Sequence, residues 1–293
     1  MTGALSVGLV GAGPWAQLVH APVLRAGPET MLAGVWSRTA QAAEALAESS
    51  GVPAFARYEE LLDACEAVAF AVPPSVQPVL AMRAAQAGKA VLLEKPLAVD
   101  VDGAERLANA VGGAGVGSLV VLTYRLSPEV RDFVGAAAAF DAFGGRACFC
   151  SGAMLAGPFA TGWRLERGAL LDVGPHAIDL IDVALGPVVG VRAMGDPLRW
   201  VSLVLEHEGG AVSDVGLTCR SAIEPSRTEV EIYGLGGSLA LDARAAVGAD
   251  TFAELRRRFA EVARAPGPHP LDVHRGLHLQ RIVAMADAEL EGR

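Results

Sequence analysis

Residues 5–16 read LSVGLVGAGPWA, an apolar run followed at once by a glycine-rich turn. The run Leu5–Val10 predicts a buried strand, and Gly11-Ala12-Gly13-Pro14-Trp15-Ala16 fits the pattern GxGxx(G/A) that opens a helix. The first glycine permits a tight turn, the second lets the backbone approach a pyrophosphate, and the helix start faces it with partial positive charge. The stretch therefore predicts dinucleotide binding by this turn. The alternative is a tight strand-to-helix turn that holds no ligand.

Outward from this turn, short apolar runs alternate with helical patterns. The predicted strands are 5–10, 31–36, 67–72, 90–93 and 119–124, and the predicted helices are 15–24, 39–48, 59–65, 76–87 and 101–110. Strands of this kind, which are nearly continuous in apolar residues, indicate a parallel sheet covered on both faces. We expect residues 1–122 to form a Rossmann-type, doubly wound dinucleotide-binding domain of an α/β protein.

The pattern changes in the second half of the chain. Strand-like runs follow one another at 146–151, 188–193, 201–206, 211–218, 228–233 and 238–241, separated by Gly-rich turns. Helical patterns cover 129–140, 177–185, 252–263 and 273–290, so that one helix interrupts the strands. Residues 123–293 are expected to form an α+β domain on an open, mainly antiparallel sheet, for substrate binding and oligomerisation.

Composition narrows the possible partners. The chain of 293 residues has 24 basic and 33 acidic residues, a net charge of −9, which argues against nucleic acid. No apolar run reaches the length of a membrane span and the N-terminus has no charged start of a secretory signal, so we expect a cytoplasmic protein with no membrane partner. The four cysteines, Cys65, Cys148, Cys150 and Cys219, are interpreted as small buried hydrophobes in a reducing compartment.

The end of the second strand distinguishes the two nicotinamide dinucleotides. An acidic residue there would bind the ribose hydroxyls of NAD, but the sequence is Trp36-Ser37-Arg38-Thr39. Ser37 can hydrogen-bond a 2′-phosphate and Arg38 can pair with it. The residues therefore favour NADP, with NAD as the second choice. The alternative for Arg38 is a solvated cation in a loop.

Lysine is rare in this chain, since only Lys89 and Lys95 occur among the basic residues. Lys95 follows the predicted strand 90–93 in the segment Glu94-Lys95-Pro96, at the strand end where ligands bind in open α/β sheets. A partly buried ammonium can exchange a proton with a reacting oxygen, which a guanidinium cannot do. Lys95 is thus a candidate catalytic residue; the alternative, a surface lysine in a turn, is our interpretation of Lys89.

A third group of polar residues combines one histidine with carboxylates. Asp172 lies four residues before His176, and Asp179 lies three residues after it. If the segment is helical throughout, all three side chains lie on one face, whereas Pro175 favours a helix start there with Asp172 just outside the helix. Either geometry lets a carboxylate orient the imidazole for acid–base work. One His and two Asps are too few ligands for a metal, so no metal site is expected. The alternative is a helix-start histidine with a structural role.

Together these motifs resemble the glucose–fructose oxidoreductase/inositol dehydrogenase (Gfo/Idh/MocA-type) family of nicotinamide-dependent oxidoreductases. The pieces that carry the resemblance, in order, are GAGPWA, SRT, AVPP at 71–74, EKPL at 94–97, YRLSP at 124–128, WRL at 163–165 and ALLDVGPHAIDL at 169–180. The resemblance implies a catalytic Lys95, an acid–base His176 and an orienting Asp172. It implies cofactor contacts at Gly11, Gly13, Pro14, Trp15, Ser37, Arg38, Pro73 and Glu94, and substrate contacts at Tyr124, Arg125, Trp163 and Arg164. A cis peptide before Pro96 is also implied.

The resemblance leads to an expected function. We expect hydride transfer between NADP(H) and a carbinol or carbonyl carbon of a sugar, a polyol or a related small hydroxy compound, by a homodimer or homotetramer. Two alternatives are a glycoside-cleaving hydrolase that retains its dinucleotide and a non-enzymatic dinucleotide-sensing regulator. The chain departs from the family at Gln77, where many members have a His, and in its short length.

Overall fold

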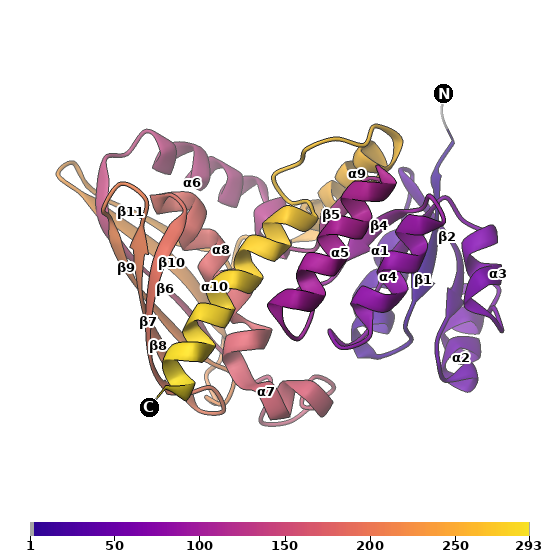
Figure 1. Ribbon diagram of the computed structural model, residues 1–293, viewed down its shortest axis with the longest axis horizontal. Helices are drawn as coiled ribbons and strands as arrows, with labels where there is room; N and C mark the ends of the chain where they lie inside the picture. The colour runs from indigo at the N-terminus through magenta and orange to yellow at the C-terminus, as the bar shows by residue number, and fades with distance from the viewer. Residues whose placement is uncertain (1–2, 293) are drawn as a thin grey trace. The chain divides into compact units, whose positions relative to one another are not determined.

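The alternation of strands and helices produces two sheets in the computed structural model, which describes residues 3–292 (Figure 1). The first unit comprises the residues up to Val121 together with Phe252–Leu277, and the second comprises Leu122–Thr251 together with the residues from His278 on. The return of 252–277 to the first unit was not expected from the sequence. The functional division at residue 122 stays a prediction.

Sheet A, in the first unit, has five parallel strands in the order β2-β1-β3-β4-β5. They are β1 (Leu5–Val10), β2 (Thr30–Trp36), β3 (Ala67–Phe70), β4 (Ala90–Leu93) and β5 (Ser118–Val120). Because β3 and β4 are buried along their whole length, their sequences AVAF and AVLL lack polar alternation. All five carboxyl ends lie at one edge of the sheet, which therefore collects the glycine turn and the Glu94-Lys95 segment.

Helices connect the strands of the first unit. They are η1 (Ala16–His20, a π-helical turn), α1 (Ala21–Arg25), α2 (Ala40–Ser50), α3 (Tyr58–Asp63), α4 (Gln77–Gln86) and α5 (Val101–Ala114). Two later helices also belong to this unit in part: α9 (Ala249–Arg264) lies almost wholly in it, and α10 (Val273–Glu291) begins in it. The Asp100 side chain accepts a hydrogen bond from Gly103 N at 2.7 Å and caps α5. Gly115, with φ of 65°, ends it.

The last strand of sheet A is shorter than predicted. The apolar run 119–124 predicted a strand as far as Tyr124, but β5 ends at Val120 and residues Thr123–Leu126 form the short 3₁₀ helix η2. β5 pairs with β4, which ends at Leu93, so the ladder has no partner strand beyond Val120. An apolar pattern cannot reveal where the neighbouring strand stops.

Sheet B, in the second unit, has six strands in the order β11-β10-β6-β9-β8-β7. They are β6 (Ala142–Cys150), β7 (Val188–Asp196), β8 (Trp200–His207), β9 (Val212–Thr218), β10 (Arg227–Gly234) and β11 (Gly237–Asp242). β6 and β9 are parallel and the other neighbours are antiparallel. Along β8 exposed and buried residues alternate strictly, because helices cover only one face of the sheet; α8 (Gly174–Leu185) packs on that face over β6, β9 and β10.

The strands of the second unit are interrupted by one more helix than predicted. Besides α6 (Pro128–Ala138) and α8, residues Gly162–Asp172 form α7. Gly168 has a non-helical φ of 73°, and α7 is two short helical pieces that meet at this kink. A Cβ at Gly168 would lie 2.1 Å from the carbonyl oxygen of Pro197, so the kink requires glycine. Because the kink interrupts the helical spacing of apolar residues, the sequence pattern did not predict α7.

The predicted fold class is confirmed, with a parallel Rossmann-like sheet followed by a mixed, mostly antiparallel sheet that carries helices. Across residues 3–292, none of the helices combines the length and the apolar character needed to cross a lipid bilayer.

Candidate functional site

The glycine turn after β1 is built as the motif predicts. Gly11 has φ of 110°, its N–H donates to the carbonyl of Trp36 at 2.8 Å, and a Cβ at this position would lie 2.2 Å from the Ala71 carbonyl oxygen. Only glycine can satisfy both the backbone angle and this close approach between the ends of β1 and β3. Gly11 is therefore required by the fold of the sheet edge itself.

Gly13 differs from Gly11 in having open space around it. It is exposed, and no heavy atom lies within 4 Å of the place that a Cβ would occupy. The helix begins directly after it, with Pro14 in the first turn, where the missing N–H of proline costs least. An open glycine at a helix start suits the close approach of a pyrophosphate, so these residues fit a dinucleotide.

A matched pair of substitutions separates the two glycines. We expect Gly11→Ala to lower the free energy of unfolding by about 1–3 kcal/mol or more, because it strains the backbone and meets the Ala71 carbonyl. Gly13→Ala is expected to leave thermal unfolding unchanged and to weaken dinucleotide binding. Chemical denaturation and a fluorescence titration with NADPH measure the two effects. Equal loss of stability in both variants would contradict this division of roles.

The other predicted cofactor residues lie at the same edge of sheet A. Ser37 and Arg38 follow β2, and Pro73 follows β3. Ser37 is half-buried, with its hydroxyl accepting a hydrogen bond from Thr39 N at 3.3 Å, and Arg38 is exposed. The guanidinium of Arg38 is thus accessible to an anion at the end of β2.

Glu94 lies at the centre of a hydrogen-bonded group that the sequence did not reveal. Its carboxylate oxygen Oε1 accepts the indole N–H of Trp15 at 2.6 Å and lies 2.8 Å from Nε2 of His20, which is buried. Trp15 and Glu94 are predicted cofactor contacts, whereas His20 is not among the predicted site residues. The three side chains tie the first helix to the segment that carries Lys95.

Gln77, noted above as a departure from the family, holds the backbone on both sides of Lys95. Its buried amide nitrogen donates to the carbonyls of Glu94 (2.8 Å), Pro96 (3.3 Å) and Leu97 (3.1 Å), and its oxygen accepts from Glu94 N at 2.8 Å. A neutral imidazole has one N–H donor and could not serve three carbonyls. In the sequence, only the replacement of the usual His by Gln marked position 77 as unusual.

The two lysines have different surroundings. Lys95 follows β4, is half-buried and precedes a cis peptide bond to Pro96, as the resemblance implied. Lys89 precedes β4, and its ammonium donates to the Cys65 carbonyl at 2.8 Å. Lys89 thus has a local structural contact far along the strand from the carboxyl end of the sheet.

His176 lies at the start of α8 and is half-buried between two aromatic rings. Tyr124 meets it edge-on, with ring centroids 5.2 Å apart at 85°, and Phe149 of β6 stacks on it at 6.3 Å and 22°. The Tyr124 hydroxyl shares a hydrogen bond of 3.0 Å with the hydroxyl of Thr228, and burial raises the pKa of this phenol. Tyr124 was predicted as a substrate contact, whereas Phe149 was missed because an aromatic residue in a strand looks like core.

The carboxylates near His176 pair with arginines. Asp172, the last residue of α7 and buried, lies 3.3 Å from Nε of Arg164, whose guanidinium also covers the rings of Trp163 (4.8 Å) and Phe159 (5.7 Å). Asp179 pairs with Arg125 at 3.2 Å. Of the predicted substrate residues, Trp163 and Arg164 thus lie with Asp172, Arg125 lies with Asp179, and Tyr124 lies with His176. The orienting role of Asp172 toward His176 stays a prediction.

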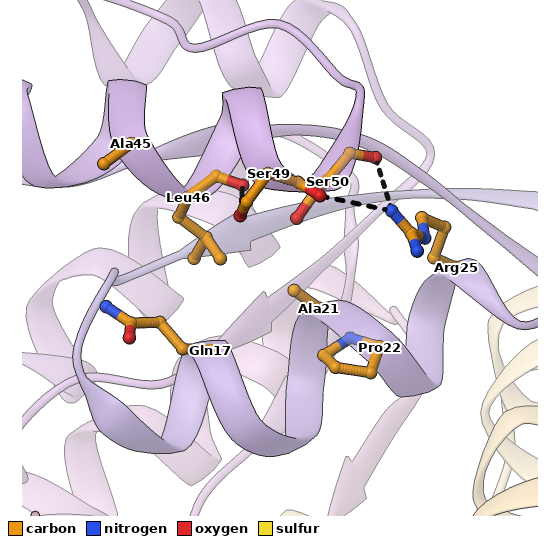
Figure 2. Close-up of a pocket in the computed structure, with 8 residues that line it drawn as sticks. All are labelled: Gln17, Ala21, Pro22, Arg25, Ala45, Leu46, Ser49 and Ser50. Carbon is orange, nitrogen blue, oxygen red and sulfur yellow. Dashed lines mark hydrogen bonds between the residues drawn. The ribbon is translucent and has the colours of Figure 1, made fainter.

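A separate hollow in the first unit lies between the first helix and α2, lined by residues such as Gln17, Pro22 and Ser49 (Figure 2). Arg25 donates there to the carbonyls of Ser49 (3.5 Å) and Ser50 (3.1 Å) at the end of α2. These bonds satisfy the terminal carbonyls of the helix, a structural role. The hollow includes none of the predicted cofactor residues. Within residues 3–292, no group of three His, Cys, Asp or Glu side chains is arranged to hold a metal ion.

The geometry of the first unit is that of a Rossmann-type dinucleotide-binding domain. Residues 5–121 match the model of an oxidoreductase family with an NAD-binding Rossmann fold, and residues 144–240 match the model of the GFO/IDH/MocA C-terminal domain. The two matches together cover more than half of the chain. The chain belongs to the Gfo/Idh/MocA family, as its motifs indicated.

Individual relatives include sugar-modifying enzymes. The chain is 31% identical over 208 residues to dTDP-3,4-didehydro-2,6-dideoxy-alpha-D-glucose 3-reductase of Streptomyces violaceoruber, a match that covers 68% of this chain and 61% of that protein. It is 29% identical over 204 residues to D-apiose dehydrogenase of Paraburkholderia graminis, covering 64% of this chain and 52% of that protein. The chain thus spans less than two thirds of the length of these curated relatives.

A solved structure supports the fold over the full length. GenD2 from gentamicin A biosynthesis, in complex with NAD, is similar with a TM-score of 0.87 at 23% identity, covering 100% of this chain and 96% of that chain. At this identity the likeness shows the fold alone.

Proposed function

We propose that the chain is an oxidoreductase that transfers a hydride between NADP(H) and a carbinol or carbonyl carbon of a sugar, a polyol or a related small hydroxy compound. The open Gly13 at a helix start, beside a Gly11 that tolerates no side chain, carries the proposal. The sugar-modifying activities in the names of the two relatives support the substrate class.

The chain's own residues divide the acid–base work of this reaction. His176, fixed by the rings of Tyr124 and Phe149, accepts the proton of the substrate hydroxyl. Lys95 stabilises the negative charge that develops on that oxygen. Asp172 fixes the tautomer of His176. When bound, the dinucleotide supplies the hydride acceptor or donor at its nicotinamide.

The choice of NADP rests on the end of β2, where Arg38 is exposed and no acidic residue occurs between Trp36 and Thr39. We expect the wild type to bind NADP more tightly than NAD. Because a hydrogen bond to a charged group contributes about 1.5–3 kcal/mol, Arg38→Ala should weaken NADP binding roughly 10- to 100-fold and leave NAD binding unchanged. Isothermal titration of both dinucleotides measures the difference.

Arg199→Ala is the matched control, because its side chain is 85% exposed and lies in the second unit. It should change neither affinity. Equal affinity of the wild type for the two dinucleotides, or an equal loss of affinity for both in Arg38→Ala, would contradict the proposal that Arg38 binds the 2′-phosphate of NADP.

We also propose a homodimer or homotetramer. The face of sheet B opposite α8 exposes Trp200 (47%), Val204 (42%) and Met194 (61%), and apolar side chains of this kind favour cover by another surface. Sedimentation equilibrium measures the subunit number, and a monomer at micromolar concentration would contradict this part.

A further inference from the structure

Arg125, which the family resemblance implied as a substrate contact, forms an ion pair inside the second unit. Its guanidinium nitrogen Nη1 donates to both carboxylate oxygens of Asp179, at 3.2 and 3.4 Å. The Arg125 side chain is 13% exposed and the Asp179 side chain is 2% exposed. Arg125 lies on η2 and Asp179 lies on α8, and both elements belong to the same unit. The positive charge of Arg125 is therefore balanced by a buried carboxylate of the fold itself.

A buried ion pair of this kind is a weak source of stability. The free energy lost when two charges leave water is comparable to the free energy gained by their attraction, and apolar side chains of the same volume often stabilise a fold as well or better. Such a pair does fix the relative position of the two elements that carry it, because a buried charge has to keep its partner. The place of the pair in the fold therefore indicates what it positions.

The pair joins η2 to the part of α8 that carries His176. Asp179 follows His176 by three residues, so the two side chains lie on the same face of the helix. Tyr124, the neighbour of Arg125 in η2, meets the His176 ring edge-on at a centroid distance of 5.2 Å. Two consecutive residues of η2 thus contact α8 at two places, one at the imidazole and one a turn beyond it.

The start of α8 needs such support, and η2 is anchored firmly enough to supply it. Val173 holds the N-cap position of α8, and its apolar side chain accepts no hydrogen bond from the first turn, which includes His176. On the other side, the Tyr124 hydroxyl shares its hydrogen bond of 3.0 Å with Thr228, a fully buried residue of β10. The sheet thus fixes η2, and η2 in turn holds the first turns of α8.

We propose that Arg125 is a positioning residue, whose ion pair with Asp179 holds the imidazole of His176 where the proposed reaction needs a proton acceptor. A displacement of a reacting group by about 1 Å costs up to roughly 100-fold in rate, so a small movement of α8 is measurable. Arg125 then contributes to kcat without touching the substrate. This kinetic consequence rests on the proposed function, whereas the effect of the pair on the position of His176 does not.

The main test removes the pair without leaving a buried charge behind. Arg125→Met alone deprives the buried Asp179 carboxylate of this partner and should lower the midpoint of thermal unfolding. Arg125→Met/Asp179→Leu puts apolar side chains in both places, so we expect a midpoint close to that of the wild type. In this folded double variant kcat should fall about 10- to 100-fold, while KM and the Kd for NADPH stay within about twofold. Steady-state kinetics, a fluorescence titration and circular dichroism measure these quantities.

Arg125→Lys distinguishes positioning from substrate recognition. A single guanidinium nitrogen makes both contacts with Asp179, so the ammonium of a lysine can replace it. We expect kcat of Arg125→Lys to lie within about threefold of the wild type and KM to be unchanged. A substrate contact would instead affect KM, and a rise in KM of about tenfold or more with kcat preserved, in this variant or in the double variant, would overturn the proposal.

The position of His176 can be followed without any turnover. In protein that contains isotopically labelled histidine, the magnetic resonance signals of the His176 imidazole are identified by their loss in His176→Ala. We expect these signals to shift or broaden in Arg125→Met/Asp179→Leu and to return toward their wild-type positions in Arg125→Lys. His207 is the internal reference, because it is buried and both of its ring nitrogens are hydrogen-bonded within the fold.

Arg167→Met is the matched control, because its guanidinium lies 3.8 Å from the carboxylate of Asp287 on α10 and does not pair with Asp179. It should leave both kcat and the His176 signals unchanged. Wild-type kcat in the folded double variant, or unchanged His176 signals there, would overturn the positioning role. A wild type that transfers no hydride to any compound would count against the proposed function alone, and the imidazole signals would then decide on the role of the pair.

Discussion

Replacement of His176 by alanine is expected to lower kcat about 10²–10⁴-fold, the contribution typical of a positioned general acid or base. The imidazole is half-buried and held between Tyr124 and Phe149, so it can accept a proton from a substrate without leaving its place. The Kd for NADPH should stay within about twofold of the wild type, because none of the predicted dinucleotide contacts changes. Steady-state kinetics and a fluorescence titration measure the two quantities.

His274→Ala is the control for this variant, since His274 is exposed on α10 and belongs to no predicted site. It should match the wild type in both kcat and Kd. A loss of NADPH binding in His176→Ala would show that the histidine has a structural role. Unchanged kcat in a folded His176→Ala protein would contradict its assignment as the acid–base residue.

The second large effect is expected at Lys95. Lys95→Arg keeps the positive charge but removes a group able to exchange a proton, so we expect kcat to fall about 10²-fold or more. Lys95→Met should lose at least as much. Because Gln77 holds the backbone around this position, neither change should unfold the segment. The measurements are kcat with saturating dinucleotide and the midpoint of thermal unfolding.

Lys89→Arg is the matched substitution at the other end of β4. Arginine can replace the ammonium in the hydrogen bond to the Cys65 carbonyl, so kcat and thermal stability should remain close to those of the wild type. Similar kcat values for Lys89→Arg and Lys95→Arg would contradict a proton-exchanging role for Lys95, and would favour a general contribution of positive charge.

Much of the first unit could be predicted, because the residues that form its strands and its glycine turn are neighbours in the sequence. The strand Leu5–Val10 and the glycine turn follow one another directly, and burial on both faces leaves β3 and β4 without polar residues. Parallel strands then bring Ser37, Pro73 and Glu94 to the same edge as Gly11, which follows from the fold class alone.

The parts that were missed depend on contacts between distant residues. Gln77 binds carbonyls at positions 94–97, and His20 meets Glu94 across 74 positions of sequence. The kink at Gly168 is required by the carbonyl of Pro197, so α7 has no continuous helical period. Cys148 and Cys150, interpreted above as buried, are half-buried, because they lie on the face of β6 away from α8, and a short apolar stretch does not reveal that face.

The most direct test of the proposed reaction compares the wild type with the double variant Lys95→Met/His176→Ala. Each protein is incubated with NADP and a panel of sugars, nucleotide sugars, polyols and small hydroxy acids, and the absorbance of the reduced nicotinamide is followed. We predict that at least one compound reduces NADP with the wild type and that the double variant, although it binds NADPH, is inactive with that compound. Identical traces for both proteins across the panel, with NADPH bound by both, would contradict hydride transfer through these residues and favour a dinucleotide sensor.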